Sequence, residues 1–237
     1  MATYIYAITA AGHPLRLEGL SGVGDPPSEL RTLKAGDLCA VVSDAPPGLR
    51  AKRRDLVAHQ SVLERLMAEG AALPMRFGLV GPDDDQVLEA LEREREGYTT
   101  RLAELDGRLE YNLKVARDEE GLLREILHDS GEARELTEYT RRNPGAQDKM
   151  MALGELVAKE VQVRQDAAGR DIASALVPAA ERTSEGEPTT KHFLNVSYLV
   201  RREDAAAFSQ AVHDEAERWG DEYEFRLNGP LPPYSFT

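Results

Sequence analysis

Apolar residues recur along this chain with two different periods, and each period predicts a type of element. Two segments predict strands that are buried on both sides: residues 3–9, which are β-branched and aromatic on both alternating faces, and the apolar residues 38–43. Two longer segments carry apolar residues three and four positions apart, as in amphipathic helices: residues 53–69 and 83–105. Together they predict an N-terminal α+β domain over residues 1–106.

The segment between these two helices, residues 73–80, is predicted to be a strand at the edge of a sheet. Pro74 has no N–H to donate to a central ladder, which confines such a strand to an edge. An edge strand can accept a further strand from a partner. Arg76 and Phe77 are residue types enriched at interface hot spots, so both are candidate partner-binding residues. Equally, Phe77 could belong to the core and Arg76 could pair with a nearby carboxylate.

The second half of the chain predicts another α+β domain, over residues 107–237. Its expected strands are residues 109–115, 192–200 and 222–227, and its expected helices are residues 118–129, 146–177 and 204–219. The order of these elements is that of a ferredoxin-like split β-α-β domain with an enlarged helical crossover: strand, two helices, strand, helix, strand. The predicted fold is therefore α+β with two domains, the second a modified ferredoxin-like domain.

Two features of this second half could bind a partner protein. The proline-rich tail, residues 229–236, cannot fold alone, so it packs back on the domain or binds a partner. Tyr234 in this tail is a third candidate partner-binding residue. The apolar stripe of the helix over residues 146–177 is either filled internally or offered to another helix.

Composition narrows the class of protein. The chain has 237 residues, with 29 Lys+Arg against 42 Asp+Glu, and its net charge of −13 argues against binding nucleic acid or anionic membranes. A single cysteine, Cys39, excludes an intrachain disulfide and a cysteine-based zinc site. No apolar run reaches the roughly 18 residues of a membrane span, and the start does not resemble a signal peptide. A soluble, cytoplasmic protein is expected.

Residues that could be catalytic or bind a metal do not form a recognisable motif in the sequence. His59 shares the apolar helix stripe of Leu56, Leu63 and Leu66, so we interpret it as a hydrogen-bonded helix histidine. The three aspartates at residues 83–85 open a helix, where carboxylates usually cap free N–H groups. The sequence contains no paired metal-ligand spacing, serine elbow or phosphate loop. We predict no catalytic, cofactor-binding or metal-binding residues, and hence no enzyme.

Several short motifs follow one another along nearly the whole chain. They are YIYAI at residues 4–8, His59-Gln60 with VLE at residues 62–64, PMRFG at residues 74–78, EYNLKV at residues 110–115, FLNVSYLV at residues 193–200 and GPLPPYSF at residues 229–236. This ordered set resembles the gas vesicle accessory proteins of the GvpF/GvpL family.

The resemblance implies a non-enzymatic assembly factor of gas vesicles, the protein-shelled buoyancy organelles. Its partners would be the small hydrophobic shell protein GvpA and other gas vesicle accessory proteins, and its location the cytoplasm and the gas vesicle. The family offers no catalytic residues to transfer to this chain. The alternative that the residues leave open is a small-molecule-binding regulatory module built on the ferredoxin-like domain.

Overall fold

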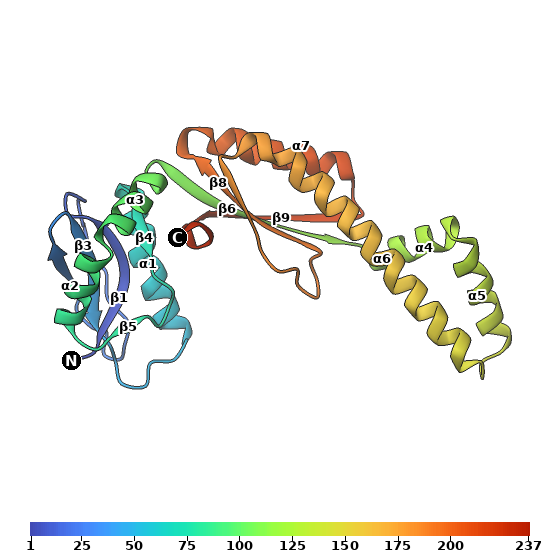
Figure 1. The fold of residues 1–237 in the computed structure, drawn as a ribbon, viewed down its shortest axis with the longest axis horizontal. Coiled ribbons are helices and arrows are strands. Elements are labelled where there is room, and N and C mark those ends of the chain that lie inside the picture. Colours follow the sequence, from blue (N-terminus) through green and yellow to red (C-terminus); the bar gives the residue numbers. More distant parts are fainter. The chain divides into compact units, whose positions relative to one another are not determined.

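The computed structural model describes residues 1–237, which form two compact units (Figure 1). The first unit contains Met1–Glu110 and Gly229–Thr237, and the second contains Tyr111–Asn228. The sequence pattern assigned the tail to the second domain, with the rest of residues 107–237. The tail returns instead to the first unit, because Phe236 is buried and Tyr234 packs against the core of that unit.

The first unit is one antiparallel sheet with helices on both faces. Its elements are β1 (Thr3–Ala10), β2 (Arg31–Ala35), β3 (Leu38–Asp44), α1 (Arg53–Glu69), β4 (Ala72–Pro74), β5 (Val80–Gly81), α2 (Asp84–Arg93) and α3 (Arg95–Leu105). The strand order is β2-β3-β1-β4, and β5 also pairs with β1. The sequence pattern did not predict β2, whose residues are mostly polar or partly exposed.

β1 contributes core side chains to both faces of this sheet. Its pairing with β3 shifts register between Ile5 and Ala7, which marks a β-bulge. Tyr6 and Ala7 both join the core cluster on the α1 face, whereas Ile5 and Ile8 face α2 on the other side. Helix α1 therefore covers one face of the sheet, and α2 and α3 cover the other (Figure 1).

The predicted edge strand over residues 73–80 lies at the sheet edge but is interrupted. β4 pairs with β1 over three residues, β5 pairs with β1 over two, and a turn separates them. The predicted helix over residues 83–105 is also divided, with a break at Glu94 between α2 and α3.

The second unit is a four-stranded sheet with an enlarged helical crossover. Its elements are β6 (Arg108–Arg117), α4 (Glu119–Asp129), α5 (Gly131–Arg142), α6 (Gln147–Leu176), β7 (Arg182–Glu185), β8 (Leu194–Arg201), α7 (Ala205–Trp219) and β9 (Tyr223–Leu231). The strand order is β7-β8-β6-β9. With α4, α5 and α6 taken as one crossover, the chain follows the β-α-β-β-α-β order of ferredoxin-like domains.

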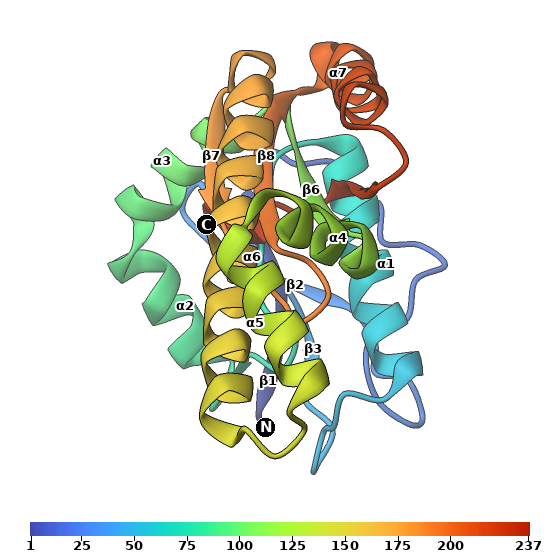
Figure 2. The same cartoon turned by 90° about the vertical axis from the view of Figure 1, so that its right-hand side faces the viewer.

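Helix α6 has two different surroundings along its length. Near its end, Ala168, Gly169, Ile172 and Leu176 are buried, and Gly169 lies against Leu194 of β8. Its first half extends beyond the sheet and packs with α4 and α5, as Figures 1 and 2 show. The apolar stripe of this helix is thus filled from within the unit near its end, whereas in its first half Met150 remains 51% exposed, so the structure leaves both alternatives open for that half.

Candidate functional site

The PMRFG motif forms a tight turn that projects from the sheet edge. The N–H of Leu79 donates to the carbonyl of Arg76 at 3.2 Å, and Gly78 between them has φ +91°. A β-turn with positive φ at its third residue favours glycine, which accounts for Gly78. Just before the turn, the N–H of Met75 donates to the carbonyl of Tyr6 at 2.8 Å, so the chain leaves the sheet only at residues 76–79. We call these residues the Arg76 turn.

His59 of α1 holds the base of the Arg76 turn. Its Nε2 lies 3.1 Å from the carbonyl oxygen of Met75, which can only accept, so Nε2 carries the proton. Nδ1 is then free to accept from the hydroxyl of Tyr4 at 2.9 Å. The oxygen of Tyr4 in turn accepts the N–H of Gly78 at 3.2 Å. A neutral imidazole therefore satisfies all the hydrogen bonds that link Met75, His59, Tyr4 and Gly78. The prediction that His59 is a hydrogen-bonded histidine on a helix is confirmed.

Aromatic rings enclose the imidazole of His59. The ring of Phe77 lies 5.7 Å from it and 6.0 Å from the ring of Tyr4, both edge to face. Tyr6 stacks on it with centroids 5.6 Å apart. The hydroxyl of Tyr234 lies 3.3 Å from Nε2, and burial raises the pKa of Tyr234 to about 12. Four motifs that are far apart in the sequence thus meet around one histidine.

The tail is fixed by a buried carboxylate that the sequence pattern did not single out. Glu110 lies on β6 between the apolar residues Leu109 and Tyr111, and it is buried as they are. Its Oε2 accepts the backbone N–H of Ser235 at 3.0 Å, and its Oε1 accepts the hydroxyl of Ser235 at 2.7 Å. Phe236, which follows Ser235 in the chain, is also buried. These contacts show that the tail packs back on its own chain.

The three candidate partner-binding residues lie in this one region with different exposure. Phe77 and Tyr234 are half-buried and pack on the core, so Phe77 follows the core alternative. Arg76 is exposed, and its guanidinium makes no ion pair, so the alternative in which it pairs with a nearby carboxylate does not occur. The Arg76 turn therefore presents an unpaired cation on a rigid aromatic base.

The buried imidazole predicts a pH dependence for the first unit. Burial lowers the pKa of His59 because it disfavours the charged form. In the unfolded chain histidine titrates near about 6.5, so below that pH the unfolded state takes up a proton first. The free energy of unfolding should be highest above about pH 6.5 and fall below it, by at most about 1.4 kcal/mol per pH unit.

Urea unfolding of the first unit at pH 7.5 and pH 5.5 would measure this dependence. In a His59→Gln variant an amide can donate to Met75 and accept from Tyr4, but it cannot titrate. The variant should lose part of the fall in stability between the two pH values. An equal fall in both proteins would show that His59 is not responsible.

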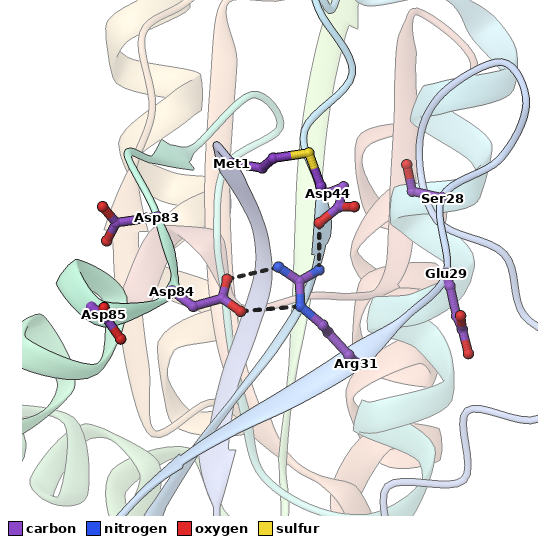
Figure 3. Close-up of a pocket in the computed structure, with 8 residues that line it drawn as sticks. All are labelled: Met1, Ser28, Glu29, Arg31, Asp44, Asp83, Asp84 and Asp85. Atoms are coloured by element: carbon purple, nitrogen blue, oxygen red, sulfur yellow. Dashed lines mark hydrogen bonds and ion pairs between the residues drawn. The ribbon is translucent and has the colours of Figure 1, made fainter.

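A cavity of about 640 Å³ lies elsewhere in the first unit and is lined mostly by carboxylates (Figure 3). Arg31 of β2 lies between Asp84, at 2.7 Å, and Asp44, at 3.0 Å, and it lowers the pKa of Asp84. The carboxylate of Asp83 accepts the N–H of Gln86, the capping role predicted for this helix start. These carboxylates join β2 and β3 to α2.

No three His, Cys, Asp or Glu side chains are grouped so that they could hold a metal ion. No helix is both long enough and apolar enough to cross a membrane. Cys39 is buried in β3, and burial raises the pKa of its thiol, so it has the character of a core residue.

Known proteins match this chain over its full length. Gas vesicle protein F of a Streptomyces species is 44% identical over 238 residues, with 100% of both chains covered. Gas vesicle protein L of the same species is 30% identical, covering 99% of this chain and 92% of that one. The crystal structure of GvpF from Anabaena sp. has a TM-score of 0.81 at 23% identity and covers 99% of this chain and 97% of its own.

GvpF from Microcystis aeruginosa also gives a TM-score of 0.81, at 24% identity, and covers 99% of this chain and 98% of its own. The two crystal structures show that the fold is the same. The family model of gas vesicle synthesis protein GvpL/GvpF matches residues 2–237. This chain, with its Arg76 turn and anchored tail, belongs to the GvpL/GvpF family of gas vesicle synthesis proteins.

Proposed function

We propose that this protein binds the small hydrophobic shell protein GvpA, together with other gas vesicle accessory proteins, in the cytoplasm while the vesicle shell assembles. The observation that carries the proposal is the family match over residues 2–237. The role is that of a non-enzymatic assembly factor. A shell subunit with a large apolar face would aggregate unless that face is covered before assembly. A binder with a net charge of −13 would keep such a complex in solution.

The Arg76 turn is the surface that we assign to this contact. Arg76 is exposed and unpaired, and it stands on a base that His59, Tyr4 and Tyr234 hold in place. Because the backbone of the turn is already fixed, less entropy is lost on binding than with a mobile loop, and arginine and aromatic residues dominate many interfaces. Phe77 and Tyr234, which are half-buried, hold the turn and offer their remaining exposed edges to the partner.

Contact through side chains fits this surface better than addition of a strand. β4 has only three residues, and Pro74 at its end has no N–H to offer an incoming strand. The edge strand expected from the sequence is therefore too short, and has too few free N–H groups, to form a long ladder of hydrogen bonds with an added partner strand. The turn beside it supplies side chains of the hot-spot type instead.

Co-expression of tagged protein with GvpA tests the function directly. If the proposal holds, GvpA that is insoluble alone elutes with this protein as one soluble species in size-exclusion chromatography. If GvpA stays insoluble and none is retained with the tagged protein, direct binding of the shell protein is refuted. Repeating the experiment with single accessory proteins then identifies which of them this chain binds.

Replacing Arg76 with alanine should weaken binding without weakening the fold. Hot-spot residues contribute about 2 kcal/mol or more, so a loss of about thirtyfold in affinity is expected. Stability should change by less than about 0.5 kcal/mol, because the side chain has no partner in the free protein. Titration of purified variants against GvpA measures the affinity, and urea unfolding measures the stability.

Arg141→Ala is the matched control for this substitution. Arg141 is also an exposed arginine without an ion pair, but it lies near the end of α5 in the second unit. It should leave the affinity unchanged. Equal affinity of the Arg76→Ala variant and the unmodified protein would remove the Arg76 turn from the interface.

A further inference from the structure

A second feature beside the Arg76 turn is an apolar cavity of about 340 Å³ on the other face of the sheet. It lies between β1 and β3 on one side and α2 and α3 on the other. Apolar side chains form most of its lining, among them Ile5 of β1, Met75, Leu79, Val80 and Ala90 of α2. The charged and amide side chains that reach it, Gln86, Glu89 and Arg93, all come from α2.

This cavity adjoins the Arg76 turn. Met75 comes directly before Arg76, Leu79 closes the turn, and both line the cavity. Leu79 and Val80 are 43% and 42% exposed, so the chain does not cover the apolar wall that they form. Arg76, whose guanidinium has no ion pair, is therefore adjacent in the chain to one lining residue, and the backbone of a second, Leu79, is hydrogen-bonded to it.

We propose that a partner segment inserts an aliphatic side chain into this cavity and pairs a neighbouring carboxylate with Arg76. The proposal rests on the function proposed above, and it names the chemistry that the same surface recognises. The lining selects an apolar group, and the free guanidinium selects an anion beside it. The partner is thus a protein segment in which an aliphatic residue and an acidic residue lie next to each other.

A protein segment fits this cavity better than a small molecule. Pockets for small molecules place polar groups so that they converge on the ligand and fix its orientation. Here the charged and amide side chains all come from one helix, while β1, β3 and the turn contribute only apolar ones. The exposed wall of Leu79 and Val80 continues out of the cavity, as expected where a larger surface docks.

Filling the cavity tests the proposal. Ala90 on α2 lines it and is only half-buried, so a phenylalanine at this position would occupy the space that the partner side chain needs. Ala90→Phe should fold normally and bind co-expressed GvpA at least tenfold more weakly. Its matched control is Ala103→Phe, on the neighbouring helix α3, where the alanine is exposed and lines a different cavity of about 480 Å³.

A second measurement, thiol labelling, does not require the protein to accommodate a large side chain at position 90. The chain has one cysteine, which is buried, so an Ala90→Cys variant carries a single accessible thiol. Maleimide should label it in the free protein and should label it at least tenfold more slowly in the complex with GvpA. Labelling at the same rate in both would overturn the proposal, as would unchanged affinity of the Ala90→Phe variant.

The outcomes separate the two proposals. If Arg76→Ala weakens binding and Ala90→Phe does not, the Arg76 turn contacts the partner but the cavity is not the pocket. If the unmodified protein does not bind GvpA at all, the proposed function itself fails. In the double variant, the loss of binding free energy could be smaller than the sum of the losses in the Arg76→Ala and Ala90→Phe variants. This result would support one shared contact, because substitutions at neighbouring sites are not additive.

Discussion

A chain that ends at Leu231 is expected to lose much of the stability of the first unit. Removing residues 232–237 exposes the surface that Phe236 covers, at a cost of about 1.5–3 kcal/mol. It also leaves the buried carboxylate of Glu110 without both groups of Ser235, which costs a further 1–3 kcal/mol or so. Small domains are stable by only about 5–15 kcal/mol, so a combined loss of this size is severe.

Hydrogen exchange would locate this loss. Amides of β1, α1 and the Arg76 turn should exchange faster in the shortened chain, because Tyr234 no longer packs beside His59. Amides of the helices α4 to α6 in the second unit should not change. Ser235→Ala, which keeps the N–H bond and removes only the hydroxyl, should cost about 1 kcal/mol. Unchanged exchange in the first unit would show that the tail is not needed for its stability.

The shortened chain should also lose GvpA binding. The tail does not have to touch the partner for this result, since the base of the Arg76 turn depends on it. The Arg76→Ala variant separates these effects, because it should bind weakly while remaining fully stable. A shortened chain that still binds would place the partner contact away from the Arg76 turn.

Helix α1 shows how far hydrophobic spacing can predict local structure. The predicted helix over residues 53–69 has the observed bounds. Its predicted stripe began at Leu56, however, which is 42% exposed, whereas the adjacent Asp55 is buried. The carboxylate of Asp55 accepts the N–H of Gly24 at 2.9 Å from a distant loop. A polar residue that is buried in order to bind a loop leaves no signal in the hydrophobic pattern.

Two elements of the second unit, β7 and α5, were not predicted from the sequence for a related reason. β7 has the sequence Arg-Thr-Ser-Glu and pairs with β8 along one edge, so it needs no apolar face. Its polar composition predicted a loop. Helix α5 likewise buries only Ala133 and is held by packing against α6. Elements stabilised by neighbours rather than by their own amphipathic pattern cannot be predicted from periodicity.

The candidate site could be predicted only in part. Arg76, Phe77 and Tyr234 were selected by residue type, and the structure brings all three to one place. The turn itself had a local signal, because glycine two positions after Arg76 permits the positive φ that Gly78 adopts. Nothing local indicates that the tail returns to His59, since burial patterns show which residues are covered but not which segments meet. Glu110 was missed for the same reason.

Phe208→Ala is expected to destabilise the second unit strongly while leaving the first unit intact. Phe208 on α7 is fully buried, and its ring lies 5.5 Å from that of Tyr111 and 5.2 Å from that of Tyr198. Truncating a buried phenylalanine costs about 3–5 kcal/mol, because a cavity remains. The melting transition of the second unit should fall by roughly 10–20 °C. Calorimetry with hydrogen exchange would assign the shift to one unit.

This substitution also tests where the partner binds. If GvpA contacts the Arg76 turn, binding should persist in the Phe208→Ala variant even at temperatures where exchange shows the second unit to be open. Phe208→Leu, which keeps most of the buried volume, should shift the transition much less and serves as the control. Binding that disappears together with the second unit would place part of the interface on that unit, and the long helix α6 would then be the next surface to mutate.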